Sequence, residues 1–132
     1  MKKSGILHAE LSRQIGLLGH TDRFVVCDSG LPLPRTMPVI DLALTGGTLD
    51  FRTVLDAILD EVVVQAHFYS QDASTTHAGE WLSERADALG EGIPKEHTDF
   101  KAMVPQCVFA VRTGEQTGYA NVICEAGVSF DV

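Results

Sequence analysis

The chain has 132 residues, of which 45% are hydrophobic, and a formal net charge of -8 at pH 7. This length is sufficient for one domain with a buried core but short for two, so we expect a single domain over residues 1–132. The acidic balance and the scattered positions of only ten Lys and Arg residues disfavour binding to nucleic acid. The longest apolar runs are far shorter than the roughly 18 residues of a membrane span, and no secretion signal is visible. We therefore expect no membrane partner.

Hydrophobic periodicity predicts the elements in chain order. The first helix follows a cap at Ser4, stops at Gly19 and is marked by apolar residues at helical spacing: Leu7, Leu11, Ile15 and Leu18. Strands are predicted at 24–28, 39–44, 61–69, 107–112 and 120–125. Further helices are predicted at 51–59, 81–89 and 98–103, and the Gly-Glu-Gly sequence at 90–92 is interpreted as the stop of the third helix.

This order of elements favours an α/β protein. Helices alternate with continuous apolar strands, which is typical of a central sheet covered by helices on both faces. We therefore expect one three-layer α/β domain. The cysteines Cys27, Cys107 and Cys124 are odd in number, lack metal-type spacing and lie in apolar segments, so we interpret them as reduced core residues. That interpretation agrees with a cytoplasmic location.

Common cofactor motifs are absent from the sequence. No G-x-G-x-x-G follows a strand, and there is no phosphate-binding P-loop, no G-x-S-x-G and no H-E-x-x-H. The five histidines, at positions 8, 20, 67, 77 and 97, include no i,i+4 pair and have no Cys-x-x-Cys beside them. We therefore expect neither a metal nor another cofactor.

Two residues near the start of the chain are candidates for function because of their positions. His20 follows Gly19 at the predicted end of the first helix, where the helix dipole favours a cation by roughly 0.3 to 1 kcal/mol. A histidine that only caps the helix is the alternative interpretation. Asp28 ends a predicted buried strand before a Gly/Pro loop, the place where α/β proteins usually gather ligand groups. A turn-forming aspartate is the alternative there.

Further candidates lie in the second half of the chain. His97 precedes Thr98, which is suited to cap a helix, and by itself His97 is better explained as a surface histidine. Tyr119 and Asn121 flank Ala120 at a loop-to-strand junction, where they would present a hydroxyl and an amide to one ligand. Taken alone, this triplet is also explained by a tyrosine at the edge of the core and a turn-forming asparagine.

Ordered blocks along the whole chain resemble one known family. These blocks are Met1-Lys2-Lys3-x-Gly5-Ile6-Leu7, Gly19-His20-Thr21-Asp22, Asp28-Ser29-Gly30-Leu31-Pro32, Ile40-Asp41-Leu42, His97-x-x-Phe100-Lys101, Arg112-Thr113-Gly114-Glu115 and Tyr119-Ala120-Asn121. Any single block would be a coincidence. Their order and separations together resemble the D-ribose pyranase family, the RbsD type.

The resemblance implies a function and a set of site residues. Members of this family exchange the pyranose and furanose forms of D-ribose without a cofactor and assemble into decameric rings. Carried over by position, the resemblance implies His20 as proton donor, and it implies a sugar-binding set that comprises Asp28, His97, Tyr119, Ala120 and Asn121. Lys101 matches a further family position near the site. Gly118 departs from the pattern, because many relatives have proline there, and this puts affinity in doubt more than reaction type.

The implied chemistry suits these residue types. Opening a cyclic hemiacetal requires one base for the anomeric hydroxyl and one acid for the ring oxygen, and a histidine supplies either protonation state near neutral pH. Two other functions stay open: a mutarotase of the related L-fucose type, and a non-catalytic sugar-binding accessory protein of a ribose transport system. The Asp28–Pro32 run and Ala120 favour the ribose branch.

The spacing of His20 and Asp28 predicts a site shared between subunits. A strand from Arg23 to Asp28 would place its ends roughly 16 Å apart, with His20 before it and Asp28 at its far end. One ribose ring is too small to be held by both residues of one chain unless the chain folds back sharply. We therefore expect His20 of one subunit to complete the pocket of a neighbour through a head-to-tail contact in a ring.

Overall fold

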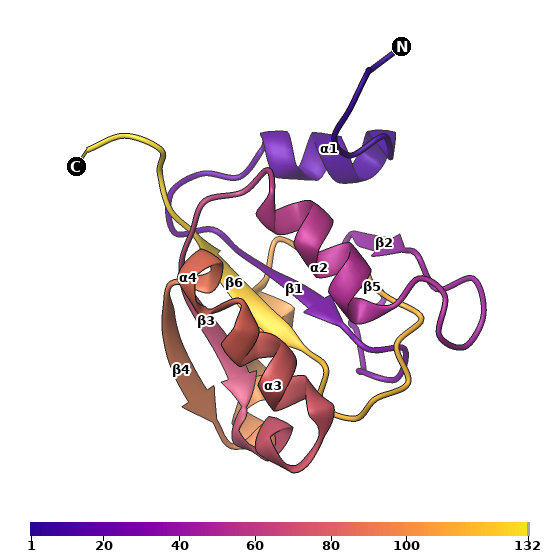
Figure 1. Cartoon of the computed structure of the whole chain (residues 1–132), viewed down its shortest axis with the longest axis vertical. Coiled ribbons are helices and arrows are strands. Elements are labelled where there is room, and N and C mark those ends of the chain that lie inside the picture. The colour runs from indigo at the N-terminus through magenta and orange to yellow at the C-terminus, as the bar shows by residue number, and fades with distance from the viewer. Residues whose placement is uncertain (132) are drawn as a thin grey trace.

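A six-stranded mixed sheet forms the centre of the computed structural model, which describes residues 1–131 (Figure 1). In spatial order the strands are β2 (Val39–Asp41), β5 (Phe109–Arg112), β1 (Arg23–Cys27), β6 (Val122–Ala126), β3 (Val64–Ser70) and β4 (Glu91–Lys95). β6 runs antiparallel to its neighbours β1 and β3, whereas the other neighbouring pairs are parallel. The carboxyl ends of the five remaining strands therefore lie at the same edge of the sheet as the amino end of β6. We call this the carboxyl edge.

Helices cover both faces of the sheet. One face carries α1 (Ala9–Gly16), α2 (Phe51–Leu59), α3 (His77–Glu84) and α4 (Ala86–Leu89). In Figure 1, α2, α3 and α4 lie in front of the strands, and α1 lies above them in the view. The opposite face carries α5 (His97–Met103) and the short 3-10 helix η2 (Val104–Gln106), while a second 3-10 helix, η1 (Gln71–Thr75), follows β3. The predicted three-layer α/β fold is thereby confirmed.

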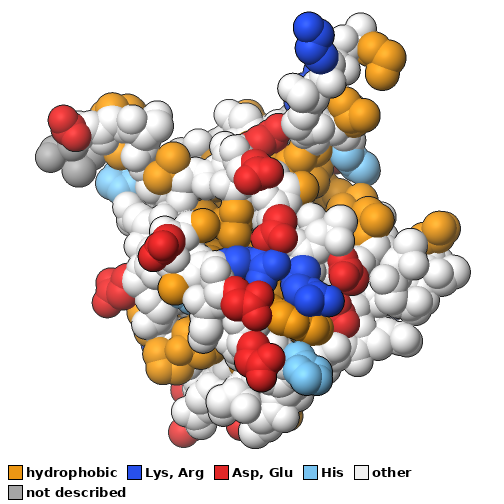
Figure 2. Space-filling view, in the orientation of Figure 1, with side chains coloured by type: hydrophobic (Ala, Val, Ile, Leu, Met, Phe, Trp, Pro, Cys, Tyr) orange, Lys and Arg blue, Asp and Glu red, His pale blue; other side chains and the backbone are white. Residues whose placement is uncertain are grey.

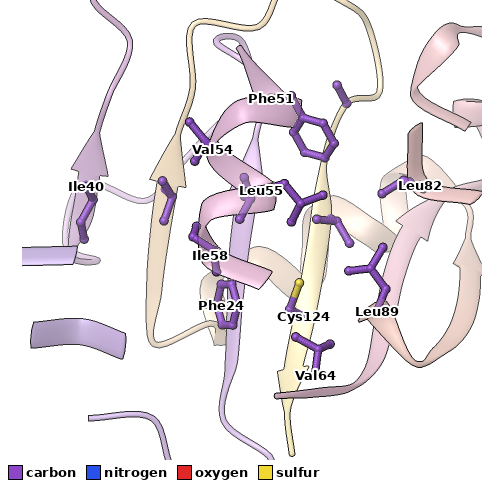
Figure 3. Packing of buried hydrophobic residues seen from close by; sticks show 14 of the residues in the cluster. Phe24, Ile40, Phe51, Val54, Leu55, Ile58, Val64, Leu82, Leu89 and Cys124 are labelled. Atoms are coloured by element: carbon purple, nitrogen blue, oxygen red, sulfur yellow. The ribbon is translucent and has the colours of Figure 1, made fainter. Parts of the chain in front are cut away.

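The larger of the two hydrophobic cores lies between α2 and the sheet (Figure 3). Asp50 caps α2 by accepting a hydrogen bond from the Thr53 amide at 3.1 Å, and the apolar side of this helix is then buried: Phe51, Val54, Leu55 and Ile58. On the strands beneath, the rings of Phe24 and Phe109 stack with centroids 5.1 Å apart. Each such side chain contributes roughly 1.5 to 3 kcal/mol on burial, which anchors the central strands that carry the candidate site.

The cysteines are core residues, as predicted. Cys27, Cys107 and Cys124 are buried and unpaired. Burial raises the pKa of Cys27 and of Cys107 to about 12, and it also raises the pKa of Cys124. Among residues 1–131, no helix has both the length and the apolar character to cross a bilayer.

The first helix differs from the prediction at both ends. Its N-cap is His8 rather than Ser4, because His8 Nδ1 accepts a hydrogen bond from the Leu11 amide at 3.1 Å. It ends at Gly16, so His20 lies beyond the helix in the turn that leads to β1. The predicted stabilisation of a cationic His20 by the helix terminus is therefore wrong.

The remaining boundaries include one strand that the prediction missed. The helix stop predicted at 90–92 is confirmed, because α4 ends at Leu89 with Gly90 as its C-cap, but the edge strand β4 that begins at Glu91 was not predicted. Gly90 has φ of 69°, and a Cβ there would collide with the backbone of Gln65 in the neighbouring strand β3. Pro94 is tolerated in β4 because an edge strand has a side that needs no backbone donor. The predicted third helix, 81–89, is instead divided at Arg85 into α3 and α4.

Candidate active site

Asp28 and Asn121 meet at the carboxyl edge and hold each other in place. Asp28 directly follows β1, and Asn121 directly precedes β6. Asn121 is 1% exposed; its Oδ1 accepts from the Asp28 amide at 2.8 Å, and its Nδ2 donates to Asp28 Oδ2 at 3.2 Å. The other carboxylate oxygen accepts from the amides of Gly30 and Leu31, both at 2.9 Å. The Asp28 carboxylate is therefore fixed, while Oδ2 keeps capacity for a further donor such as a hydroxyl.

His97 and Tyr119 lie together at the same edge. His97 is the first residue of α5, and its ring meets that of Tyr119 edge-on, with centroids 5.0 Å apart and planes at 90°. Tyr119 has φ of 64°, a left-handed conformation that turns the chain sharply before Asn121. Within residues 1–131, His97 Nδ1 is the one buried side-chain nitrogen or oxygen that lacks a hydrogen-bond partner. Because this atom is buried, a ligand hydroxyl would reach it only after the imidazole ring turned.

Ala120 and Lys101 occupy contrasting places. Ala120 is fully buried in the larger core, backbone as well as side chain, so it presents no accessible atom to a ligand in the single chain. Lys101 is exposed on α5 one turn after His97, and residues four apart lie on the same side of a helix. Lys101 is therefore directed to the same side of α5 as His97.

Residues of two of the sequence blocks, 40–42 and 112–115, support the carboxyl edge. Arg112 at the end of β5 donates to both carboxylate oxygens of Asp41 at 3.0 Å and to the Ser29 carbonyl, which ties β5 to β2 and to the loop after Asp28. A Cβ at Gly114 would lie 2.5 Å from the Thr48 carbonyl oxygen, so only glycine fits there. These residues shape the loop that carries Asp28.

Glu115 completes the support of the same loop. It is 9% exposed and accepts from the amide of Phe51 at 3.1 Å and from that of Thr117 at 3.2 Å. Its own carbonyl accepts from the Ser29 amide at 2.9 Å. The segment leading to Tyr119 is thereby connected to the start of α2 and to the loop after β1.

His20 lies at the opposite edge of the sheet. Its turn is closed by the Gly19 amide, which donates to Asp22 Oδ2 at 2.8 Å, and by the Thr21 amide, which donates to the Ala126 carbonyl at the end of β6. Thr21 has φ of 73°. His20 is exposed on this turn, before β1 and beside the carboxyl end of β6.

Three polar residues beside His20 were not predicted from the sequence. His20 Nε2 is 2.9 Å from Gln65 Oε1, and Gln65 Nε2 donates to Glu125 Oε2 at 2.8 Å. Arg23 contacts Glu125 Oε1 through Nε at 3.0 Å and through Nη2 at 2.9 Å. The hydrogen bond from Gln65 and the pairing with Arg23 hold the pKa of Glu125 below its ordinary value, against the opposing effect of burial. Glu125 was marked in the sequence as the one charged residue in the otherwise apolar strand β6, whereas Gln65 lies in a strand with several other polar residues.

The structure thus brings the predicted sugar-binding residues together and leaves His20 apart. β1 separates His20 from Asp28, and its five residues span roughly 16 Å or more with their flanks. Two hollows, of about 770 and 290 Å³, are lined by none of the predicted site residues. Charged side chains of both signs are mixed on the face shown in Figure 2, which carries no broad basic surface.

Comparison with known proteins identifies the family. Residues 1–129 match the model of the RbsD / FucU transport protein family. The chain belongs to this family. A D-ribose pyranase of Cutibacterium acnes is 47% identical over 130 residues, which is 98% of this chain and 100% of the relative. A D-ribose pyranase of Geobacillus kaustophilus is 44% identical and covers 98% of this chain and 96% of the relative.

Solved structures of the family share the fold. Bacillus subtilis RbsD complexed with D-ribose superimposes with a TM-score of 0.93 at 33% identity, and the match covers 98% of this chain and 100% of that one. The fucose mutarotase of Streptococcus pneumoniae, in complex with L-fucose, gives a TM-score of 0.79 at 20% identity and covers 94% of this chain and 95% of that one. At 20% identity, the comparison with the second structure shows a shared fold and nothing more.

Proposed function

We propose that this chain is a D-ribose pyranase, an isomerase that interconverts the pyranose and furanose forms of D-ribose. The observation that carries the proposal is the full-length identity of 47% and 44% to relatives that bear this name. The L-fucose mutarotase function has weaker support, because the matching structure is only 20% identical. A non-catalytic binding protein would need the same hydroxyl-binding groups, so activity has to be measured to separate it from an enzyme.

The residues at the carboxyl edge are suited to hold a sugar. Asp28 Oδ2 accepts hydrogen bonds, and Tyr119 supplies a hydroxyl that both donates and accepts. The unpartnered Nδ1 of His97 adds a further polar atom at this edge. Fixed groups of this kind bind a polyhydroxylated ligand through directed hydrogen bonds and orient its ring for reaction.

His20 is the proposed acid. Protonation of the ring oxygen by an imidazolium, with loss of the anomeric proton, opens the hemiacetal to the free aldehyde. Closure through a different hydroxyl then gives the other ring size. Positioned general acid-base catalysis of this kind typically contributes about 10²- to 10⁴-fold. Neither step requires a metal or a covalent intermediate.

The opposite locations of His20 and Asp28 support a site shared between subunits. We propose that His20 of one chain reaches the carboxyl edge of its neighbour in a head-to-tail ring, and that the assembly is the homodecamer expected from the family resemblance. His20 is exposed and therefore accessible to a neighbour. Buried free thiols are suited to a reducing cytoplasm, which is the proposed location.

The test is a measurement of ring exchange by NMR. Saturation transfer between the pyranose and furanose signals of D-ribose, with and without the protein, should show faster exchange with the protein. His20→Ala should abolish the acceleration while circular dichroism and oligomer size stay as in the wild type. If the wild-type protein does not change the exchange rate, the result favours a non-catalytic binding protein. If it accelerates the exchange of L-fucose more than that of D-ribose, the result favours the fucose mutarotase function.

A further inference from the structure

Gln65 connects His20 to a fixed carboxylate. Gln65 Oε1 lies 2.9 Å from His20 Nε2, and Gln65 Nε2 lies 2.8 Å from Glu125 Oε2. The three residues come from the turn before β1, from β3 and from β6, which are held side by side by the sheet. The arrangement is therefore set by strand pairing and not by a flexible loop alone.

The orientation of the Gln65 amide follows from its partner. An ionised carboxylate only accepts hydrogen bonds, so Gln65 must present its NH₂ group to Glu125 and its carbonyl oxygen to His20. Arg23 holds the carboxylate from the other side through Nε and Nη2, at 3.0 and 2.9 Å. Because Gln65 and Arg23 lower its pKa, Glu125 stays ionised at neutral pH. The reversed orientation of the Gln65 amide, with its oxygen facing this carboxylate, is therefore disfavoured.

The amide orientation in turn decides where His20 carries its proton. A carbonyl oxygen only accepts, so the contact with Gln65 requires a proton on His20 Nε2. A neutral imidazole has one ring proton, which leaves Nδ1 bare. We infer that Gln65 is a positioning residue, held by Glu125 and Arg23, which fixes the tautomer of His20 and makes Nδ1 the atom that exchanges protons with the sugar. The inference rests on the proposed role of His20 as acid.

The proton balance is then simple. In ring opening, the imidazolium gives its Nδ1 proton to the ring oxygen, the bond from that oxygen to the anomeric carbon breaks, and the anomeric hydroxyl releases its proton to solvent as the aldehyde forms. Closure reverses these steps: Nδ1 takes the proton of the attacking hydroxyl and the carbonyl oxygen regains one from solvent. The second ring proton stays on Nε2, which donates to Gln65 Oε1 throughout, so this hydrogen bond is not broken during the cycle.

The tautomer is measured directly by ¹⁵N NMR of the ring nitrogens in the assembled, histidine-labelled protein, at alkaline pH where imidazole rings are neutral. His20→Ala identifies the signals. In the wild type we expect a protonated Nε2 and a bare Nδ1. Gln65→Lys replaces the acceptor by an ammonium that only donates, so the proton should move to Nδ1. Gln65→Met, of similar length but without hydrogen bonds, should give a mixture of the two tautomers.

Exchange rates test the consequence for catalysis. Gln65→Met should lower kcat roughly threefold to tenfold with little change in KM, as expected for the loss of one hydrogen bond that acts on the acid. Gln106→Met is the matched control, because Gln106 is an exposed glutamine in η2 away from this network. The swapped double variant Gln65→Glu with Glu125→Gln keeps an acceptor toward His20, and should retain both the tautomer and the activity.

Three results would overturn the inference. One is a bare Nε2 in the wild type, and another is a Gln65→Lys variant that keeps its proton on Nε2. The third is that the tautomers are as expected, but His20→Ala still accelerates ring exchange of D-ribose as much as the wild type does. That third result contradicts the proposed role of His20 as acid but not the ring-exchange activity, whereas the first two contradict only the role of Gln65.

Discussion

Asn121→Asp places a second carboxylate against Asp28 and should make the stability of the protein depend strongly on pH. The new side chain is nearly isosteric, and one of its oxygens still accepts from the Asp28 amide. The other replaces the Nδ2 donor that now lies 3.2 Å from Asp28 Oδ2, so two acceptors face each other at an almost fully buried position. In the folded state, either one of the two carboxyl groups takes up a proton, or both stay ionised and their negative charges repel each other.

The size of the effect follows from that distance. Two like charges 3.2 Å apart repel by about 5 kcal/mol at an effective dielectric of about 20. Uptake of a proton at pH 7 by a carboxyl group with a reference pKa of about 3.9 costs only about 4 kcal/mol, so protonation sets the upper limit. We expect the free energy of unfolding to fall by up to about 4 kcal/mol at pH 7.

The destabilisation caused by Asn121→Asp should become smaller as the pH falls. The folded variant holds a proton between its carboxylates that the unfolded chain releases above pH 4. Folding therefore takes up a proton, and the loss of stability should shrink by about 1.4 kcal/mol for each pH unit below 7. Urea unfolding at pH 7, 6 and 5, at equal protomer concentration, measures this slope. Asn121→Ala is the control, since it loses both hydrogen bonds to Asp28 without adding a charge and should be destabilised equally at pH 7 and pH 5. An equal loss at pH 7 and pH 5 in Asn121→Asp as well would refute the reasoning.

Three further predictions concern individual residues. Cys27, Cys107 and Cys124 should not react with a thiol reagent in the native protein but should all react in urea, because burial raises the pKa of each thiol; labelling followed by mass spectrometry decides this. Gly118→Ala should raise the free energy of unfolding by about 0.4 to 1 kcal/mol, since the added Cβ meets only a methyl group 3.9 Å away and the unfolded chain loses freedom. Burial lowers the pKa of His67 below 6.5, so the unfolded state binds more protons and stability should fall as pH drops below about 6.5. His67→Phe should flatten this part of the profile in urea titrations.

Periodicity in the sequence was sufficient for most of the architecture. Apolar runs mark strands because the central strands are buried on both faces, as β1 is, with four of its five residues fully buried. The edge strand β4 escaped prediction for the opposite reason. It is half-exposed, and Gly92 and Pro94 signal a break in the chain, although an edge position tolerates both.

The candidate site was predictable where its residues stand next to element boundaries. Asp28 and Asn121 were singled out at strand ends, and the sheet brings both to the carboxyl edge. The contacts of Gln65 and Glu125 depend on which strands are neighbours, and that information is absent from local patterns. The environment of His20 was misread for the same reason, since its partner comes from β3 and not from the preceding helix.

The most direct test of the shared site is subunit complementation. His20→Ala and Asp28→Asn subunits are denatured, mixed at equal ratio and reassembled, and mixed oligomers are verified by native mass spectrometry. About one quarter of randomly formed interfaces then pair an intact His20 with an intact Asp28. Saturation transfer on D-ribose should show about one quarter of the wild-type exchange activity in the mixture and none in either parent. Verified mixed oligomers that remain as inactive as both parents would contradict a site shared between subunits.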